Sequence, residues 1–204
     1  MRKRGFLVVI SGPSGTGKNS VLELLRDEMP DLSYSVSATT RSMREGEVNS
    51  EHYYFMTREE FLMREANQEF IETAEFCGNL YGTLKSVIES KLSDGIDVIM
   101  DIETKGAKQV RLAFPDAVMV FLMPPSFDEL RQRLLLRGKD SSEEIERRLA
   151  VAREEAYEVS HYSYVVVNNN LIAAAKEVSS IIRAERCRIE RLSVDMFLRT
   201  LDSK

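Results

Sequence analysis

The sequence has little of what marks a secreted, membrane-bound or nucleic-acid-binding protein. It contains no tryptophan and only two cysteines, Cys77 and Cys187, whose separation matches no metal-ligand or redox spacing. No apolar run approaches the roughly 18 residues that a membrane span needs, and the start of the chain does not resemble a signal peptide. The net charge is −5, so no overall basic field attracts nucleic acid. We expect a cytoplasmic protein without nucleic-acid or membrane partners, either a monomer or a homodimer.

What the sequence does contain is a glycine-rich loop between an apolar strand, 6–10, and an amphipathic helix. Residues 11–20 read Ser-Gly-Pro-Ser-Gly-Thr-Gly-Lys-Asn-Ser. The glycines let backbone N–H groups turn inward, and the positive end of the helix dipole adds to this anion cradle. The lysine is placed to reach the β- and γ-phosphates, which predicts ATP as the ligand. The predicted ATP-binding residues of this loop are Gly12, Pro13, Ser14, Gly15, Thr16, Gly17, Lys18, Asn19 and Ser20.

One position departs from the usual phosphate-loop pattern. Serine or threonine normally follows the lysine and holds Mg²⁺, whereas this chain has Asn19 there and Ser20 one step later. The Asn19 amide oxygen, the Ser20 hydroxyl or a water molecule could each fill the position. Asp101, at the end of a later apolar strand, is a further candidate for holding Mg²⁺ through water.

Apolar strands alternate with helices along the chain, which predicts an α/β fold with a parallel sheet covered on both faces. The strand-like runs are 6–10, 96–101, 117–123 and 164–168, and the helical stretches lie around 18–29, 104–113, 126–150 and 171–192. Residues 34–92 carry shorter alternating runs and more aromatics, so they are expected to form a mixed insertion. A second insertion, 126–155, is dense in charge of both signs.

Two groups of residues in the first insertion favour nucleotide recognition. Within 35–47, hydroxyls alternate along a strand and precede Arg41 and Arg44, whose planar guanidinium groups suit phosphate oxygens. Glu72 lies on a strand near the hydroxyls of 81–83, and a single carboxylate can accept both hydrogen bonds from the N1–H and N2 amine of guanine. Taken alone, each group could equally be a solvated strand edge.

Charged residues beyond the first insertion are further candidates for binding metal or substrate and for assisting phosphoryl transfer. Asp101 and Glu103 end a core strand on the same face, where they could hold Mg²⁺ through water or contact substrate. Arg137 and Arg148 in the second insertion suit a mobile cover for phosphoryl transfer, which needs charge neutralisation and exclusion of water. Alternatively, the two acids could simply be polar residues where a strand ends, and the two arginines could belong to a solvated helix face.

The ordered motifs resemble the guanylate kinase family over almost the whole chain. The resemblance is carried by residues 11–18, 35–49, 69–72, 78–83, 101–107, 124–126, 137–138 and 167–168. It implies a transferase of purine nucleotide metabolism that converts GMP, and also dGMP, with ATP by direct phosphoryl transfer. It also implies a three-layer P-loop kinase core (1–33, 93–125 and 156–204), a mixed α+β GMP-binding domain (34–92) and a helical lid (126–155).

The resemblance further implies a role for each matching residue. Those expected to read guanine are Ser37, Glu72, Thr83 and Asp101. Those expected at the GMP phosphate are Arg41, Arg44, Tyr53 and Tyr81, with Glu103 in the same site. Those expected to neutralise the transferred group are Lys18, Arg44, Arg137 and Arg148. Asn168 is expected near the adenine of ATP. Glu103 and Lys105 depart from the Asp and Gln that are more common in the family, but neither removes a charge that transfer needs.

Two other functions are weighed against this one. A guanylate-kinase-like module that has lost catalysis and binds proteins typically loses the phosphate loop, which is intact here. A sister kinase acting on another phosphorylated sugar or nucleotide is disfavoured by Ser37, Glu72 and 81–83, which suit a purine edge with two donors.

Overall fold

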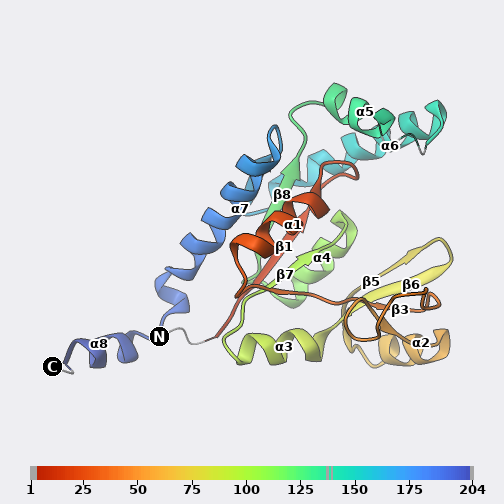
Figure 1. Ribbon diagram of the computed structural model, residues 1–204. Coiled ribbons are helices and arrows are strands. Elements are labelled where there is room, and N and C mark those ends of the chain that lie inside the picture. The colour runs from red at the N-terminus through yellow and green to blue at the C-terminus, as the bar shows by residue number, and fades with distance from the viewer. Residues whose placement is uncertain (1–3, 137, 139, 203–204) are drawn as a thin grey trace.

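A five-stranded parallel sheet forms the centre of the protein, and its strand order is β2-β7-β1-β8-β9 (Figure 1). The computed structural model describes residues 4–136, 138 and 140–202. Arg137, predicted to be catalytic, lies outside the described residues. The strands in spatial order are β2 (Ser33–Tyr34), β7 (Val98–Asp101), β1 (Leu7–Ser11), β8 (Val118–Met123) and β9 (Tyr164–Val167). The predicted α/β fold with a parallel core sheet is confirmed.

Helices cover both faces of this sheet (Figure 1). Val8 and Ile10 of β1 belong to an apolar cluster with α1 and α7, whereas Leu7 and Val9 belong to one with α3 and α4. All four side chains are at most 2% exposed, so β1 is buried on both faces, as its unbroken apolar run predicts. The helices are α1 (Lys18–Glu28), α7 (Leu171–Arg186), α3 (Lys85–Ser93) and α4 (Thr104–Ala113).

A second, four-stranded sheet is inserted between β2 and β7 in the sequence, with strand order β4-β3-β6-β5. Its strands pair in both directions, because β3 is parallel to β4 but antiparallel to β6. Phe61 of the adjoining helix is fully buried and stacks on Phe70, with ring centroids 4.3 Å apart. The elements of this mixed unit are β3 (Ala38–Thr39), β4 (Tyr54–Phe55), α2 (Arg58–Ala66), β5 (Phe70–Phe76) and β6 (Asn79–Leu84).

The charged segment after β8 forms a pair of helices, α5 (Phe127–Leu136) and α6 (Ser142–Ala156). The sequence analysis expected one helical stretch around 126–150. Gly138 interrupts it with φ +62°, a left-handed conformation that glycine adopts freely. The Ser141 side chain then accepts a hydrogen bond from the Glu144 N–H and begins α6. The two helices enclose a small apolar cluster of their own.

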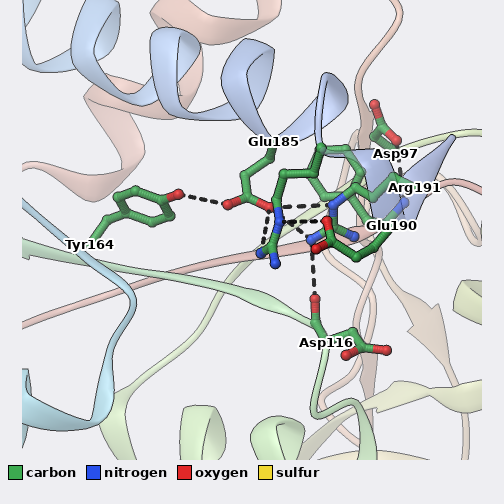
Figure 2. Close-up of polar contacts among 8 residues, drawn as sticks. Asp97, Asp116, Tyr164, Glu185, Glu190 and Arg191 are labelled. Atoms are coloured by element: carbon green, nitrogen blue, oxygen red, sulfur yellow. Dashed lines mark hydrogen bonds and ion pairs between the residues drawn. The ribbon is translucent and has the colours of Figure 1, made fainter.

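A buried ionic network holds the end of α7 against the core sheet (Figure 2). Glu185 is only 3% exposed; Tyr164 Oη donates to it at 2.6 Å and Arg191 at 2.9 Å. Burial acts to raise the pKa of Glu185, but these hydrogen bonds and the nearby arginines lower it below its usual value. The Arg191 guanidinium also lies over the Phe6 ring, 4.2 Å from its centroid. The network therefore joins the segment after α7 to β9 and to the residue directly before β1.

The remaining elements are short or peripheral. The turn η1 (Tyr157–His161) follows α6, the turn η2 (Ile189–Arg191) follows α7, and α8 (Val194–Asp202) extends away from the core sheet (Figure 1). Within the described ranges, no helix has the length and apolar character that crossing a membrane would require.

A second buried carboxylate generates a prediction about stability. The Asp97 side chain is fully buried, and its oxygens accept from Arg186 Nε at 2.8 Å and from the Phe6 N–H at 3.2 Å. Removing the guanidinium takes one charged partner from this buried carboxylate, which is strongly destabilising. We expect Arg186→Met to lower the free energy of unfolding by about 3 kcal/mol in urea titrations.

The matched control lies three residues earlier on the same helix. Arg183 pairs with Glu28 at 3.0 Å, but its side chain is 59% exposed, so Arg183→Met should cost less than about 1 kcal/mol. Equal losses in the two variants would contradict the role given to Arg186.

Candidate active site

The loop after β1 has the geometry of an anion cradle, and two of its glycines are required by close packing. Gly12 has φ +142°, and a Cβ there would lie 2.2 Å from the Leu122 carbonyl oxygen of β8. Gly17 has φ +93°, and a Cβ would lie 2.5 Å from Asn168 Nδ2. No L side chain fits either position without movement of a neighbouring strand or loop.

Hydrogen bonds within the loop hold its shape and its lysine. The buried Thr16 hydroxyl donates to the Pro13 carbonyl at 2.9 Å, so this side chain stabilises the turn. Lys18 begins α1, and its Nζ donates to the Gly12 carbonyl at 2.8 Å. The positive end of α1 and the ammonium group therefore lie at the same loop, where both favour an anion.

Asn168, directly after β9, is hydrogen-bonded to the backbone of this loop. It is 4% exposed, and its side-chain amide donates to the Thr16 carbonyl at 2.7 Å. Its own carbonyl oxygen accepts from Arg133 at 2.8 Å, which ties the loop to α5. The predicted contact of Asn168 with adenine stays a prediction.

A cavity of about 340 Å³ lies beside the loop, and Lys18 and three carboxylates line it. Burial raises the pKa of Asp101, the adjacent Lys18 acts to lower it, and Glu103 acts to raise it. The charged or loop residues that line the cavity are Gly12, Ser14, Lys18, Asp101, Glu103 and Glu155. The sequence analysis missed Glu155; the available signal was its spacing of seven residues from Arg148, which puts both on one face of a helix.

A second cavity, of about 270 Å³, adjoins the first through Asp101. Its lining also includes Asn19 and Ser37, whereas the half-buried Ser20 lines neither cavity. Of the three predicted metal ligands, the structure thus brings Asn19 and Asp101 together. Their oxygen atoms are donors that suit a hard cation. Among the described residues, no group of three or more His, Cys, Asp or Glu side chains forms a ready-made metal site.

Glu72 and Thr83 form a buried polar pair across β5 and β6, where the second sheet meets α4. The Thr83 hydroxyl donates to Glu72 Oε1 at 2.8 Å, and Glu72 is 6% exposed. A Cβ on Gly106 would lie 3.1 Å from Glu72 Oε2, so the first turn of α4 closely approaches this carboxylate. Burial raises the pKa of Glu72, and the hydrogen bonds from Thr83 partly oppose that shift.

The predicted phosphate-binding residues gather around one carboxylate, Glu47. Arg41 donates to both of its oxygens at 2.6 and 3.0 Å, and the Arg44 N–H donates at 2.7 Å, which lowers the pKa of Glu47 to about 2. The Arg41 guanidinium lies 5.3 Å from the Tyr53 ring centroid, and Tyr53 meets Tyr81 edge-on at 6.1 Å. The Arg44 side chain is exposed.

Arg148 connects α6 with the glycine-rich loop. Its guanidinium donates to Ser14 Oγ at 2.6 Å and pairs with Asp140 at 2.5 Å. The other arginines of α6 have different partners: Arg147 pairs with Glu144, and Arg153 lies over the Phe127 ring. Arg148 is therefore the α6 arginine that reaches the predicted phosphate site.

Comparisons with known proteins agree with this geometry. A profile of the family described as Guanylate kinase matches residues 4–185. A guanylate kinase of Desulfitobacterium hafniense is 47% identical over 190 residues, which cover 93% of this chain and 95% of the relative. One of Lactococcus lactis subsp. lactis is 45% identical over 202 residues, 99% and 98% of the two chains.

A solved structure gives the same result in three dimensions. The crystal structure of guanylate kinase from Anaplasma phagocytophilum superposes with a TM-score of 0.71 at 36% identity, covering 93% of this chain and 90% of that one. The match includes the parallel sheet and the loop after β1 that together make a P-loop kinase fold. By profile, by sequence and by structure, the chain belongs to the guanylate kinase family.

Proposed function

We propose that this protein transfers the γ-phosphoryl group of ATP to GMP and forms ADP and GDP. A phosphate oxygen of GMP attacks the γ-phosphorus while the bond to the β-phosphate oxygen of ATP breaks, with no covalent enzyme intermediate. The observation that carries the proposal is the buried Glu72–Thr83 pair, whose carboxylate lies against Gly106, three residues after Glu103 of the cavity beside the loop. Membership of the guanylate kinase family supports the same substrates. We include dGMP as a substrate, a cytoplasmic location and a place in purine nucleotide metabolism.

Guanine recognition is assigned to the acceptor side of the site. The Glu72 carboxylate accepts from the N1–H and N2 amine of guanine, while its Oε1 keeps the bond from the Thr83 hydroxyl. Ser37 and Asp101, on the wall of the second cavity, complete the base site. Adenine has no such pair of donors, so the same carboxylate disfavours it.

The GMP phosphate is assigned to Arg41, Arg44, Tyr53 and Tyr81, with Glu103 at the edge of the site. Glu47 holds Arg41 over the Tyr53 ring, so the guanidinium is already oriented before a phosphate arrives. The exposed Arg44 is free to turn toward both the acceptor phosphate and the transferred group, which explains a role in binding and in catalysis.

The donor side is assigned to the glycine-rich loop. Its N–H groups and Lys18 bind the ATP phosphates, and Arg148, together with Arg137, neutralises the group in transfer. Asn19 and Asp101 would hold Mg²⁺, partly through water, at the boundary between the two cavities, because Asp101 lines both of them. When bound, Mg²⁺ supplies positive charge to the β- and γ-phosphates. We also propose the division into core, GMP-binding domain and lid at the predicted boundaries, in a monomer or a homodimer.

The first prediction about the site concerns Glu72. In Glu72→Gln the amide offers one acceptor and one donor, so it satisfies only one of the two guanine donors and opposes the other. We expect kcat/KM for GMP to fall about 100-fold in a coupled ADP-release assay, with KM for ATP nearly unchanged. Glu75→Gln, at an exposed position on the same strand, is the matched control. Turnover of AMP by the native protein, or unchanged GMP turnover by the variant, would contradict the assignment.

The second prediction concerns pH. GMP binding needs the charged form of Glu72, and burial raises the pKa of this carboxyl group. As the pH is lowered, KM for GMP should therefore begin to rise at a higher pH than it would with an exposed glutamate. The Thr83 hydroxyl favours the charged form, and therefore Thr83→Val should raise the pKa further and move the acid limb upward. The measurement is KM against pH for both proteins, in which ionisation of GMP itself cancels. A limb at the same pH in both would contradict this role.

The third prediction concerns Asn19. Asn19→Ala removes a side-chain oxygen from the cavity that contains Asp101, so the Mg²⁺ concentration for half-maximal velocity should rise at least about threefold. Asn19→Ser keeps a side-chain oxygen, so its Mg²⁺ concentration for half-maximal velocity should lie between those of the native protein and Asn19→Ala. Mn²⁺ titration in the presence of a non-hydrolysable ATP analogue measures the same effect without turnover. An unchanged metal dependence in Asn19→Ala would remove Asn19 from the metal site.

A further inference from the structure

A hydrogen bond between Thr104 and Glu155 joins the base of α6 to the start of α4. Thr104 is 5% exposed, and its hydroxyl donates to Glu155 Oε1 at 2.9 Å. Glu155 belongs to the last turn of α6 and lines the cavity beside the glycine-rich loop. Hydrogen bonds from a neutral donor to a carboxylate are stronger than those between neutral groups, especially where water is excluded.

This bond has a geometric consequence for Arg148. Arg148 and Glu155 are seven residues apart on α6, so they share one face and are separated by about 10 Å along the helix. Two side-chain contacts on that face therefore join α6 to the core, one at Ser14 of the loop and one at Thr104. The apolar cluster joins α6 to α5, so these two polar contacts are what relate this face of α6 to the loop and to α4.

Helix α4 is also the element that holds the acceptor side. Its Gly106 lies against the Glu72 carboxylate, and its Gln109 amide both donates to and accepts from the Thr73 backbone at 3.1 Å. The Thr104–Glu155 bond thus places α6 relative to the same helix that positions β5. The groups on the donor side and on the acceptor side are therefore both positioned against α4.

We propose that Thr104 and Glu155 are positioning residues for phosphoryl transfer: their hydrogen bond fixes α6 so that Arg148 meets the donor phosphates. The inference rests on the role given to Arg148 under the proposed function. The bond also occupies Glu155 Oε1 with a hydroxyl donor. Neither residue is assigned a contact with the reacting atoms.

The test begins with Thr104→Val, which removes the hydroxyl but keeps the shape of the side chain. We expect kcat to fall roughly tenfold, the loss of one hydrogen bond to a charged group, while KM for GMP changes less than about twofold. Thr104→Ser should restore most of kcat. Lys108→Gln is the matched control, because it breaks the pair between the exposed Lys108 and Glu158, one turn further along α4. A merely structural contact would lower the melting temperature of Thr104→Val without changing kcat at saturating substrate.

A double-variant cycle separates this inference from the proposed function. Arg148→Met should itself lower kcat, and adding Thr104→Val to it should then have little further effect, because Thr104 acts through Arg148. If Arg148→Met retained native kcat, the proposed role of Arg148 would fail. If Arg148→Met were slow but Thr104→Val were native-like or fully additive with it, the positioning role would be wrong while the proposed function stood.

Discussion

The parallel pairing of β1 between β7 and β8 is the constraint on which the rest of the site depends. The register aligns Ile10 with Asp101 and Ser11 with Phe121, so the carboxyl ends of three strands meet at one edge of the sheet. The loop must leave β1 so close to β8 that only glycine fits at position 12. Because the strands are buried on both faces, this register cannot slip without exposing apolar side chains. The phosphate cradle and the carboxylate beside it are therefore positioned by the core.

Buried carboxylates occur on two sides of the protein, but their partners differ. On the side of the candidate site, Glu72 of the second sheet has a hydroxyl as its hydrogen-bond donor, and burial raises its pKa and that of Asp101 at the end of β7. At the start of β7 and the end of α7, Asp97 and Glu185 are paired with arginines. A buried carboxylate without an arginine keeps acceptor capacity for a ligand with N–H donors, whereas a paired one contributes to the fold. The difference separates the candidate site from the structural network.

Much of the fold was predictable because its signals are local. The apolar run of β1, the glycines after it and the amphipathic α1 follow one another in sequence, and the helix predicted over 104–113 coincides with α4. The division of the segment around 126–150 into two helices was harder to predict, because its helical periodicity hides the break. The break depends on the left-handed backbone of Gly138 and on the capping hydrogen bond of Ser141. Residue types also indicated the guanine site, because Glu72 and Thr83 have a chemistry that matches the base. The residue roles in that site stay predictions.

By itself, the sequence determined the family, the parallel α/β core and the identity of the phosphate loop, since each depends on motifs or periods within a short stretch. The tertiary structure decided which distant side chains meet: Arg148 with Ser14, Thr104 with Glu155, and Asn168 with the loop carbonyl. These partners are from 51 to 152 residues apart. Their contacts follow from strand order and helix packing, which no local pattern encodes. Likewise, Asn19, the irregular position of the loop, lines one cavity with Asp101 because β1 pairs with β7 in the sheet.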